Sequence, residues 1–186
     1  MGMDVRTRRR EVLTGLASRL AGTFIHGVPA RIRRSPDAVR ITWDFPDGAR
    51  GMVQIAPIRS EIGAGMFALE PRVTVAGGPL ADALERAVLP SPVASLPPSL
   101  LSADCRQLGG RRATFTIRPA EPGGVEAVHE EITRLLIPAI GAFAGNWPAA
   151  LAIVLRAPET VAYPADLAAI LAAWTGDGPA QRHCAG

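Results

Sequence analysis

Residues 31–45 read RIRRSPDAVRITWDF, and this stretch decides the fold. In its second half apolar residues alternate with polar ones, which is the period of a β-strand with one buried face. The segment Ser35-Pro36-Asp37-Ala38 has the composition of a tight turn. A hairpin closed at this turn gives two facing pairs, Ile32 with Ile41 and Arg33 with Arg40. Apolar side chains therefore share one face of the hairpin, and arginines share the other.

A second turn follows at Asp47-Gly48. A two-residue loop here would place Ile41 opposite Gln54 and mix the two faces. A three-residue loop over Asp47-Gly48-Ala49 keeps the faces separate and is the register that we predict. It gives two facing pairs, Trp43 with Val53 and Ile41 with Ile55.

Two more strands are indicated farther along the chain, at 66–75 and 111–118. Pro71 cannot donate a ladder hydrogen bond, which predicts an edge strand or a bulge at that position. In the first strand the inward side chains are Phe67, Leu69, Val73 and Val75, and the outward ones are Glu70, Arg72 and Thr74. In the second strand the inward side chains are Ala113, Phe115 and Ile117.

The remaining segments have helical periodicity. An amphipathic helix near the N-terminus has an apolar stripe of Val12, Leu13, Leu16, Leu20 and Phe24. A short helix runs from Gly77-Gly78-Pro79 to about Val88. A longer helix begins at Gly124, with a stripe that continues to Phe143 and a kink or interruption at Pro138. Two further helices begin at Asn146-Trp147-Pro148 and at Tyr163-Pro164.

This order of elements predicts an α+β fold. We expect an N-terminal helix, a mostly antiparallel sheet of about four to five strands, and a C-terminal helical cluster packed on one sheet face. The other sheet face should then be polar. Residues 1–175 are predicted to form a single domain with a Pro-rich internal connector at 89–103, and residues 176–186 a flexible tail.

Composition excludes several kinds of chemistry. All 20 basic residues among the 186 are arginines, so no lysine is present for a Schiff base or for a phosphate-binding GK[ST] loop. Residues 1–60 contain 11 arginines against 5 acids, and residues 61–186 contain 9 against 12. The N-terminal third is therefore basic, although the net charge of +3 is modest for a nucleic-acid module.

Two observations bear on the compartment. The only cysteines are Cys105 and Cys184, which provide neither a disulfide framework nor metal-ligand spacing. No stretch approaches the roughly 18 apolar residues of a membrane span. We therefore expect a cytoplasmic protein without a membrane span.

No segment of the sequence matches a complete catalytic motif. The segment His129-Glu130-Glu131-Ile132-Thr133 resembles the start of a zinc-protease helix, but Thr133 occupies the position of the second histidine. Cys105, His129 and Asn146 have the residue types of a thiol protease, yet no local motif surrounds the cysteine. Asp104 could be paired with either glutamate, although pairs of acids arise by chance in any such domain. We predict no metal site, no cofactor and no catalytic residue, and favour a protein that is not an enzyme.

The arginines on the outward phase of the strands are the strongest functional signal. Since Arg33 faces Arg40, the two like charges need either a neighbouring acid or a binding partner. Asp44, Glu70 and solvent could neutralise them, or an anionic partner could dock on the open sheet face. The predicted binding residues are Arg31, Arg33, Arg40, Arg72, Arg112 and Arg118.

An acidic protein is the partner that we expect on this face. Nucleic acid is less favoured, though not excluded, because RNA-binding sheets present aromatic side chains outward. Here the aromatic residues fall on the inward phase, at Trp43, Phe45, Phe67 and Phe115. No pattern in the sequence indicates an oligomeric state.

The sequence therefore predicts a non-enzymatic bacterial binding or interaction protein. Its layout resembles that of small bacterial α+β domains, some of which accompany toxin systems as proposed immunity proteins, and this analogy extends to the fold alone. The alternative is a small-molecule-binding or hydrolytic domain with a pocket between the sheet and the C-terminal helices, near Trp147 and Trp174. Tryptophans at helical spacing are also typical of a simple packed core.

Overall fold

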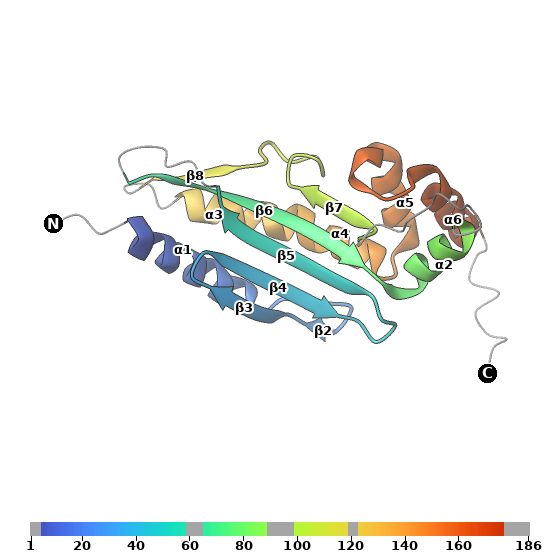
Figure 1. Ribbon diagram of the computed structural model, residues 1–186, viewed down its shortest axis with the longest axis horizontal. Coiled ribbons are helices and arrows are strands. Elements are labelled where there is room, and N and C mark those ends of the chain that lie inside the picture. Colours follow the sequence, from blue (N-terminus) through green and yellow to red (C-terminus); the bar gives the residue numbers. More distant parts are fainter. Residues whose placement is uncertain (1–4, 59–64, 89–98, 119–122, 177–186) are drawn as a thin grey trace.

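A computed structural model describes residues 5–58, 65–88, 99–118 and 123–176 of the chain (Figure 1). The helices are α1 (Val5–Leu20), α2 (Gly78–Val88), α3 (Gly123–Glu131), the π-helical turn η1 (Ile132–Leu136), α4 (Ile137–Phe143), α5 (Trp147–Arg156), the short 3-10 helix η2 (Pro158–Thr160) and α6 (Pro164–Gly176). The strands are β1 (Phe24–Ile25), β2 (Val28–Pro29), β3 (Arg31–Ser35), β4 (Ala38–Asp44), β5 (Arg50–Pro57), β6 (Phe67–Ala76), β7 (Leu101–Asp104) and β8 (Phe115–Ile117).

The main sheet is antiparallel and has six strands, in the order β3-β4-β5-β6-β7, with β8 also paired to β6. Strands β1 and β2 form a separate small hairpin. The α+β architecture predicted from the sequence is confirmed, including the N-terminal helix and the C-terminal helical cluster.

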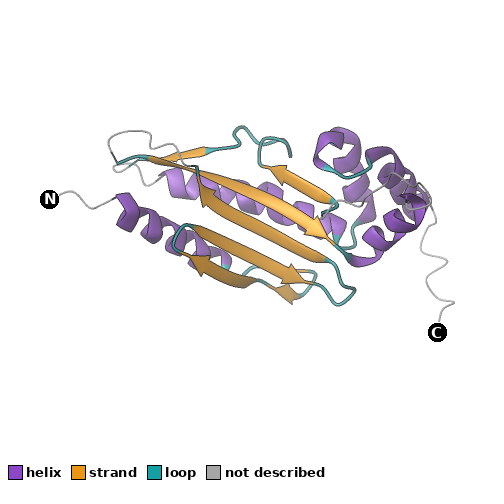
Figure 2. Ribbon diagram, viewed as in Figure 1, coloured by secondary structure: helices purple, strands orange, loops and turns teal. Residues whose placement is uncertain are grey.

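The described helices that contact the main sheet cover the same face, and no described helix covers the opposite face, which we call the open face (Figure 2). Helix α1 packs on β3 and β4, α4 packs on β5 and β6, and η1 packs on β6. Helices α2, α5 and α6 gather at one end of the sheet, where α6 contacts both of the others (Figure 1). Between the layers lies one continuous cluster of buried side chains, with Trp43, Ile41, Val53 and Val73 fully buried on the inner sheet face.

The predicted first hairpin is confirmed. Strands β3 and β4 pair with Ile32 opposite Ile41 and with Arg33 opposite Arg40. Val39, Ile41, Trp43 and Phe45 are all buried, so the inward phase inferred from their alternation is also correct.

The register of the second hairpin differs from the prediction. Trp43 pairs with Gly51 and Ile41 with Val53, because the loop comprises Pro46-Asp47-Gly48 and lies one residue earlier. The Phe45 N–H donates to the Ala49 carbonyl at 2.9 Å, and Gly48 adopts a positive φ of 86°. Each β4 residue pairs with a β5 residue two positions earlier than predicted. Because side chains alternate with a period of two, the same side chains still face inward.

Pro71 lies in an interior strand, so the prediction of an edge strand or a bulge there is wrong. On one side of β6, β8 pairs with Phe67–Leu69 and β7 pairs with Arg72–Val75. The Val75 carbonyl accepts a hydrogen bond from the Leu100 N–H on that side. Because backbone groups two residues apart point the same way, the Pro71 nitrogen faces the gap between β8 and β7, where no donor is required.

Three element boundaries also differ. The chain turns after Leu20, so Phe24 lies in β1 with 64% of its surface exposed and does not belong to the apolar stripe of α1. The predicted connector at 89–103 is too long, because Leu101–Asp104 forms the buried strand β7; residues 89–98 lie outside the described ranges. Strand β8 covers only three residues of the predicted 111–118. The predicted tail at 177–186 is likewise outside the described ranges.

Pro138 follows a π-helical turn. The Ile137 N–H donates to the Ile132 carbonyl, five residues earlier, and Pro138 then lies in the first turn of α4, where a missing N–H is tolerated. The predicted interruption is therefore present as η1.

Among the described helices no single one has the length and apolarity to cross a membrane. Gly123–Phe143 and Trp147–Arg156 meet those criteria only as a pair, with a bend of 116° between them.

Candidate interaction surface

A row of polar side chains crosses the open face of the sheet from β3 to β7. Successive cross-strand pairs link one residue on each strand. The members are Arg33, Arg40, Gln54, Arg72 and Asp104, and we call this set the arginine row. Because cross-strand neighbours on one sheet face have Cβ atoms roughly 5 Å apart, the row is a continuous band of long polar side chains.

The charges in the row are unevenly balanced. Arg72 forms an ion pair with Glu70 at 3.3 Å, and Asp104 lies at the β7 end. Arg33 and Arg40, at the β3 end, are exposed and have no ion pair with any residue that the structure describes. The row therefore changes from basic at β3 and β4 to mixed at β6 and β7.

Asp44 forms ion pairs with a second pair of arginines beside the row and offsets one of their two charges. Its carboxylate contacts Arg31 at 3.3 Å and Arg50 at 2.5 Å. These three residues lie at a shallow hollow of about 460 Å³ near the β4–β5 loop. The neutralisation by acids that the sequence suggested thus occurs at Arg31 and Arg72, but not at Arg33 and Arg40.

The rest of the open face is flat and carries short or flexible side chains. The row next to the arginine row consists of Arg31, Thr42, Met52, Thr74 and Ser102. Within the six described strands, no aromatic residue lies on this face: Trp43, Phe45, Phe67 and Phe115 are all buried on the other side. The surface offers hydrogen-bond donors and positive charge without stacking platforms.

Two of the six predicted binding residues lie away from this surface. Arg112 precedes β8 and lines a pocket at the edge of the sheet. Arg118 follows β8, and its carbonyl accepts a hydrogen bond from Arg8 of α1 at 2.9 Å. The structure therefore brings together Arg31, Arg33, Arg40 and Arg72 only. Arg50 and Gln54 complete the surface; the sequence analysis omitted them, although both lie on the outward phase in the predicted register as well as in the observed one.

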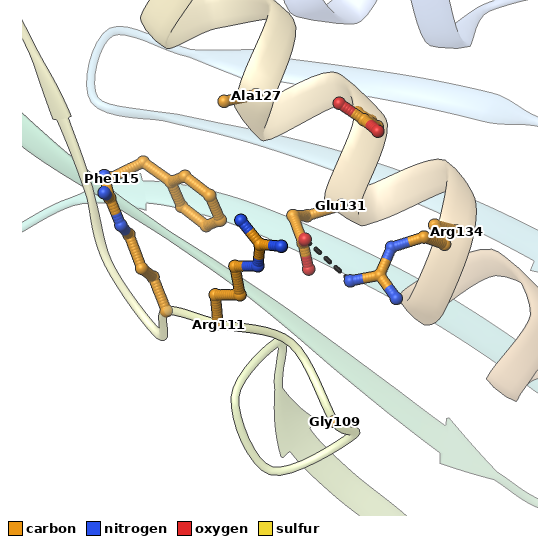
Figure 3. A pocket seen from close by; sticks show the side chains of 8 residues that line it. Gly109, Arg111, Phe115, Ala127, Glu131 and Arg134 are labelled. Atoms are coloured by element: carbon orange, nitrogen blue, oxygen red, sulfur yellow. Dashed lines mark hydrogen bonds and ion pairs between the residues drawn. The ribbon is translucent and has the colours of Figure 1, made fainter.

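The pocket beside β8 has a volume of about 520 Å³ and lies between residues 109–115 and the α3–η1 helix (Figure 3). We call it the β8 pocket. Arg134 donates to Glu131 at 2.7 Å, whereas Arg111 and Arg112 form no ion pair within the described part of the chain. Its lining residues are Gly109, Arg111, Arg112, Phe115, Ala127, Glu130, Glu131 and Arg134.

The loop that forms one wall of the β8 pocket is anchored to the sheet and to the helix. Asp104 and Gln107 exchange two hydrogen bonds of 3.0 Å between side chain and backbone. The Gly110 N–H donates to the Cys105 carbonyl at 2.7 Å. A Cβ atom on Gly110 would lie 2.6 Å from both the Cys105 carbonyl oxygen and Glu131 Oε2, so a side chain here would force the loop backbone to shift.

Two of the residues that resembled catalytic groups, Cys105 and Asn146, have structural roles. Cys105 is fully buried, and burial together with the nearby carboxylates of Glu131 and Asp104 raises the pKa of its thiol to about 12. A thiol with this pKa is protonated at neutral pH and is a poor nucleophile. The Asn146 side chain caps α5 by accepting a hydrogen bond from the Ala149 N–H. Among the described residues, no cluster of three or more His, Cys, Asp or Glu side chains could hold a metal ion.

Trp147 and Trp174 pack against each other edge to face, with ring centroids 5.0 Å apart. This contact joins α5 to α6 and is of the kind expected in a packed core. The two tryptophans named for the alternative ligand pocket thus contact each other across α5 and α6.

The comparisons with known proteins give no relative. No protein-family model matches the chain, and neither the curated proteins nor the solved structures contain a match.

Proposed function

We propose that this protein is a non-enzymatic binding protein that docks an acidic protein on the open face of its sheet. The observation that carries the proposal is the facing pair Arg33 and Arg40, which is exposed and forms no ion pair with any described residue. Like charges directly opposite each other destabilise a sheet. A carboxylate from a partner placed between the two guanidinium groups would relieve this repulsion and gain charge-assisted hydrogen bonds.

A purely protective role explains only one of the two arginines. Charged side chains on an edge strand discourage edge-to-edge aggregation, and this would be sufficient reason for Arg33 on β3. Arg40 is on β4, which is paired on both sides and has no free edge to protect. Its charge is therefore better explained by recognition.

An acidic protein fits the surface better than nucleic acid does. Single-stranded nucleic acids bind sheets through stacking on outward aromatic side chains, and the open face has none within the described strands. The acidic groups at the far end of the row, Glu70 and Asp104, would repel a phosphate backbone that followed the row. A protein can instead match a basic patch at one end and an acidic patch at the other.

A bacterial, cytoplasmic setting is part of the same proposal. An immunity protein that neutralises an acidic toxin would use this kind of surface, and charge complementarity would give it a high association rate. The Cys105 thiol is buried and protonated, the Asp104 carboxylate accepts a hydrogen bond from the Gln107 N–H, and the Asn146 side chain caps α5. These existing roles support a binding function over a catalytic one.

The test is a binding measurement on the partner recovered from the native host after nuclease treatment. The double variant Arg33→Gln with Arg40→Gln should bind the purified partner at least about tenfold more weakly, a loss of ~1.4 kcal/mol. Its binding should also depend less on salt concentration. A matched control is Arg10→Gln with Arg86→Gln, which removes two exposed arginines from α1 and α2 and should bind like the unmodified protein.

Two results would contradict the proposal. One is equal affinity of the unmodified protein and the Arg33/Arg40 double variant for the partner. The other is a partner that disappears on nuclease treatment, which would identify the surface as a nucleic-acid site.

A further inference from the structure

We propose that the β8 pocket is a second, separate binding site, and that its ligand is a small organic monocarboxylate with an apolar ring or chain. The pocket lies at the β8 edge of the sheet, whereas the uncompensated arginines of the arginine row lie on β3 and β4. The inference does not depend on the partner proposed for the open sheet face.

The charge of the lining selects a monoanion. Among the described lining residues there are three guanidinium groups and two carboxylates, which leaves one net positive charge. Arg134 is already engaged by Glu131, so the positive charges available to a ligand are those of Arg111 and Arg112. A phosphate monoester would bring about two negative charges close to Glu130 and Glu131 and would be repelled. One carboxylate balances the site.

The arginines are suited to a carboxylate in geometry as well as in charge. A guanidinium group presents paired N–H donors that match the two oxygens of a carboxylate. Figure 3 shows the Arg111 guanidinium pointing into the space between Phe115 and the Glu131 side chain. A carboxylate there can accept hydrogen bonds from Arg111.

The remaining wall accounts for the apolar part of the ligand. Phe115 and Ala127 contribute a ring and a methyl group to the same space, from β8 and α3 respectively (Figure 3). Ligand sites commonly combine apolar walls with a few fixed polar groups, and the volume of about 520 Å³ lies in their usual range. A ring packed on Phe115 would place its carboxylate toward the arginines.

The anchoring of the loop reduces the entropic cost of binding. The two Asp104–Gln107 hydrogen bonds and the Gly110–Cys105 hydrogen bond fix the backbone immediately before Arg111. The helix wall is fixed in turn by its packing on the sheet. A ligand therefore has to order only the arginine side chains, which favours measurable affinity for a small molecule.

The experiment is an NMR titration of the isotopically labelled full chain with benzoate as the probe. Benzoate should shift the backbone amides of Gly109, Phe115 and Arg134 in a saturable manner, with a Kd of about 1–10 mM for so small a ligand. Benzamide has the same shape without the charge, and inorganic phosphate has the charge without the ring. Both should produce shifts at least about tenfold smaller at equal concentration.

Variants locate the site. Arg111→Gln with Arg112→Gln should abolish the benzoate shifts, and Arg10→Gln with Arg86→Gln should leave them unchanged. The comparison of benzoate with benzamide on the unmodified chain tests the proposal even if the double variant fails to fold. The proposal is overturned if benzoate causes no saturable shift, if benzamide or phosphate binds as well as benzoate, or if the folded Arg111/Arg112 variant retains binding.

Discussion

Arg33 and Arg40 lie directly opposite each other on β3 and β4, on the open face of the sheet, and neither has an ion pair in the described structure. The facing charges lower the stability of the free protein and at the same time form the basic end of the arginine row. Stability of the free protein and affinity for an acidic partner should therefore respond in opposite directions to a change at either residue.

The first prediction follows from this opposition. Arg33→Glu replaces a repulsive cross-strand pair with an attractive one, and should increase the free energy of unfolding by about 0.2–1 kcal/mol at low salt. The same change should weaken binding of an acidic partner. Urea unfolding at low and high salt measures the first effect, and the gain should shrink as salt is added. A variant that is less stable than the unmodified protein at low salt would refute the expected repulsion.

The second prediction concerns the contact between the sheet and α4. A Cβ atom on Gly51 would lie 2.1 Å from Ile140 Cγ2, and Ile140 is fully buried. Gly51→Ala should therefore destabilise the protein by about 1–3 kcal/mol through overpacking, although alanine in an open strand position is normally the better residue. Thermal or urea unfolding measures the loss.

A double-mutant cycle separates overpacking from other effects. Ile140→Ala alone should cost about 2–5 kcal/mol, because it leaves a cavity. In that background the Cγ2 atom is absent, so Gly51→Ala should cost little or even stabilise the protein. Additive effects of the two substitutions would show that the clash is not the cause.

The third prediction is an alkaline loss of stability caused by Cys105. Burial raises the pKa of this thiol from about 9.0 in the unfolded chain to about 12 in the folded protein. The folded state then holds its proton more tightly, so the contribution to stability is complete below pH 9 and is lost as the pH rises from 9 towards 12. In a Cys184→Ser background, Cys105→Ala should flatten the fall in unfolding free energy over this range.

Thiol reactivity gives an independent measurement of the same property. At pH 8 the folded Cys184→Ser protein should react with a thiol reagent far more slowly than the same protein in denaturant. Rapid labelling of the folded protein would contradict both the burial and the raised pKa of Cys105.

The fourth prediction concerns the contact between α1 and α3. Arg19 donates to Glu126 at 2.8 Å, and this hydrogen bond lowers the pKa of the exposed glutamate. The resulting stabilisation is present above the unfolded pKa, near 4.5, and is lost as the pH falls through the folded value. Arg19→Gln should raise the Glu126 pKa in an NMR titration, whereas Arg10→Gln should not. An unchanged Glu126 pKa in the Arg19 variant would rule out the ion pair in solution.

The first hairpin could be predicted from the sequence because its information is local. A proline-containing turn and seven alternating residues in β4 allow one register that keeps Ile32 and Ile41 on the same face. The start of helix α5 could be predicted in the same way. The capping residue Asn146 is followed two positions later by Pro148, and this pattern is a local signal of a helix start.

The errors arose where distant contacts decide the structure. The second hairpin loop lies one residue earlier than predicted, in a register that places Gly51, with no side chain, beneath Ile140 of α4. No local pattern shows that contact. Arg112 was predicted to point outward from a strand over 111–118. Strand β8 begins only at Phe115, so Arg112 belongs instead to the segment between the anchored loop and β8, beside α3.

The π-helical turn η1 has a consequence for how this helix tolerates changes in length. Val128, Ile132, Leu136 and Ile140 are four residues apart and are all fully buried. In an uninterrupted α-helix each such step would rotate the side chain by about 40°, or roughly 120° over the three steps. The wider turn absorbs part of that rotation. Deleting one residue between Ile132 and Leu136 would restore an ordinary helix in which Val128, Ile132, Leu136 and Ile140 are spaced four, three and four residues apart and fall on one face, so Ile140 should stay under the sheet. The packing of α4 should therefore tolerate the loss of one residue from this turn.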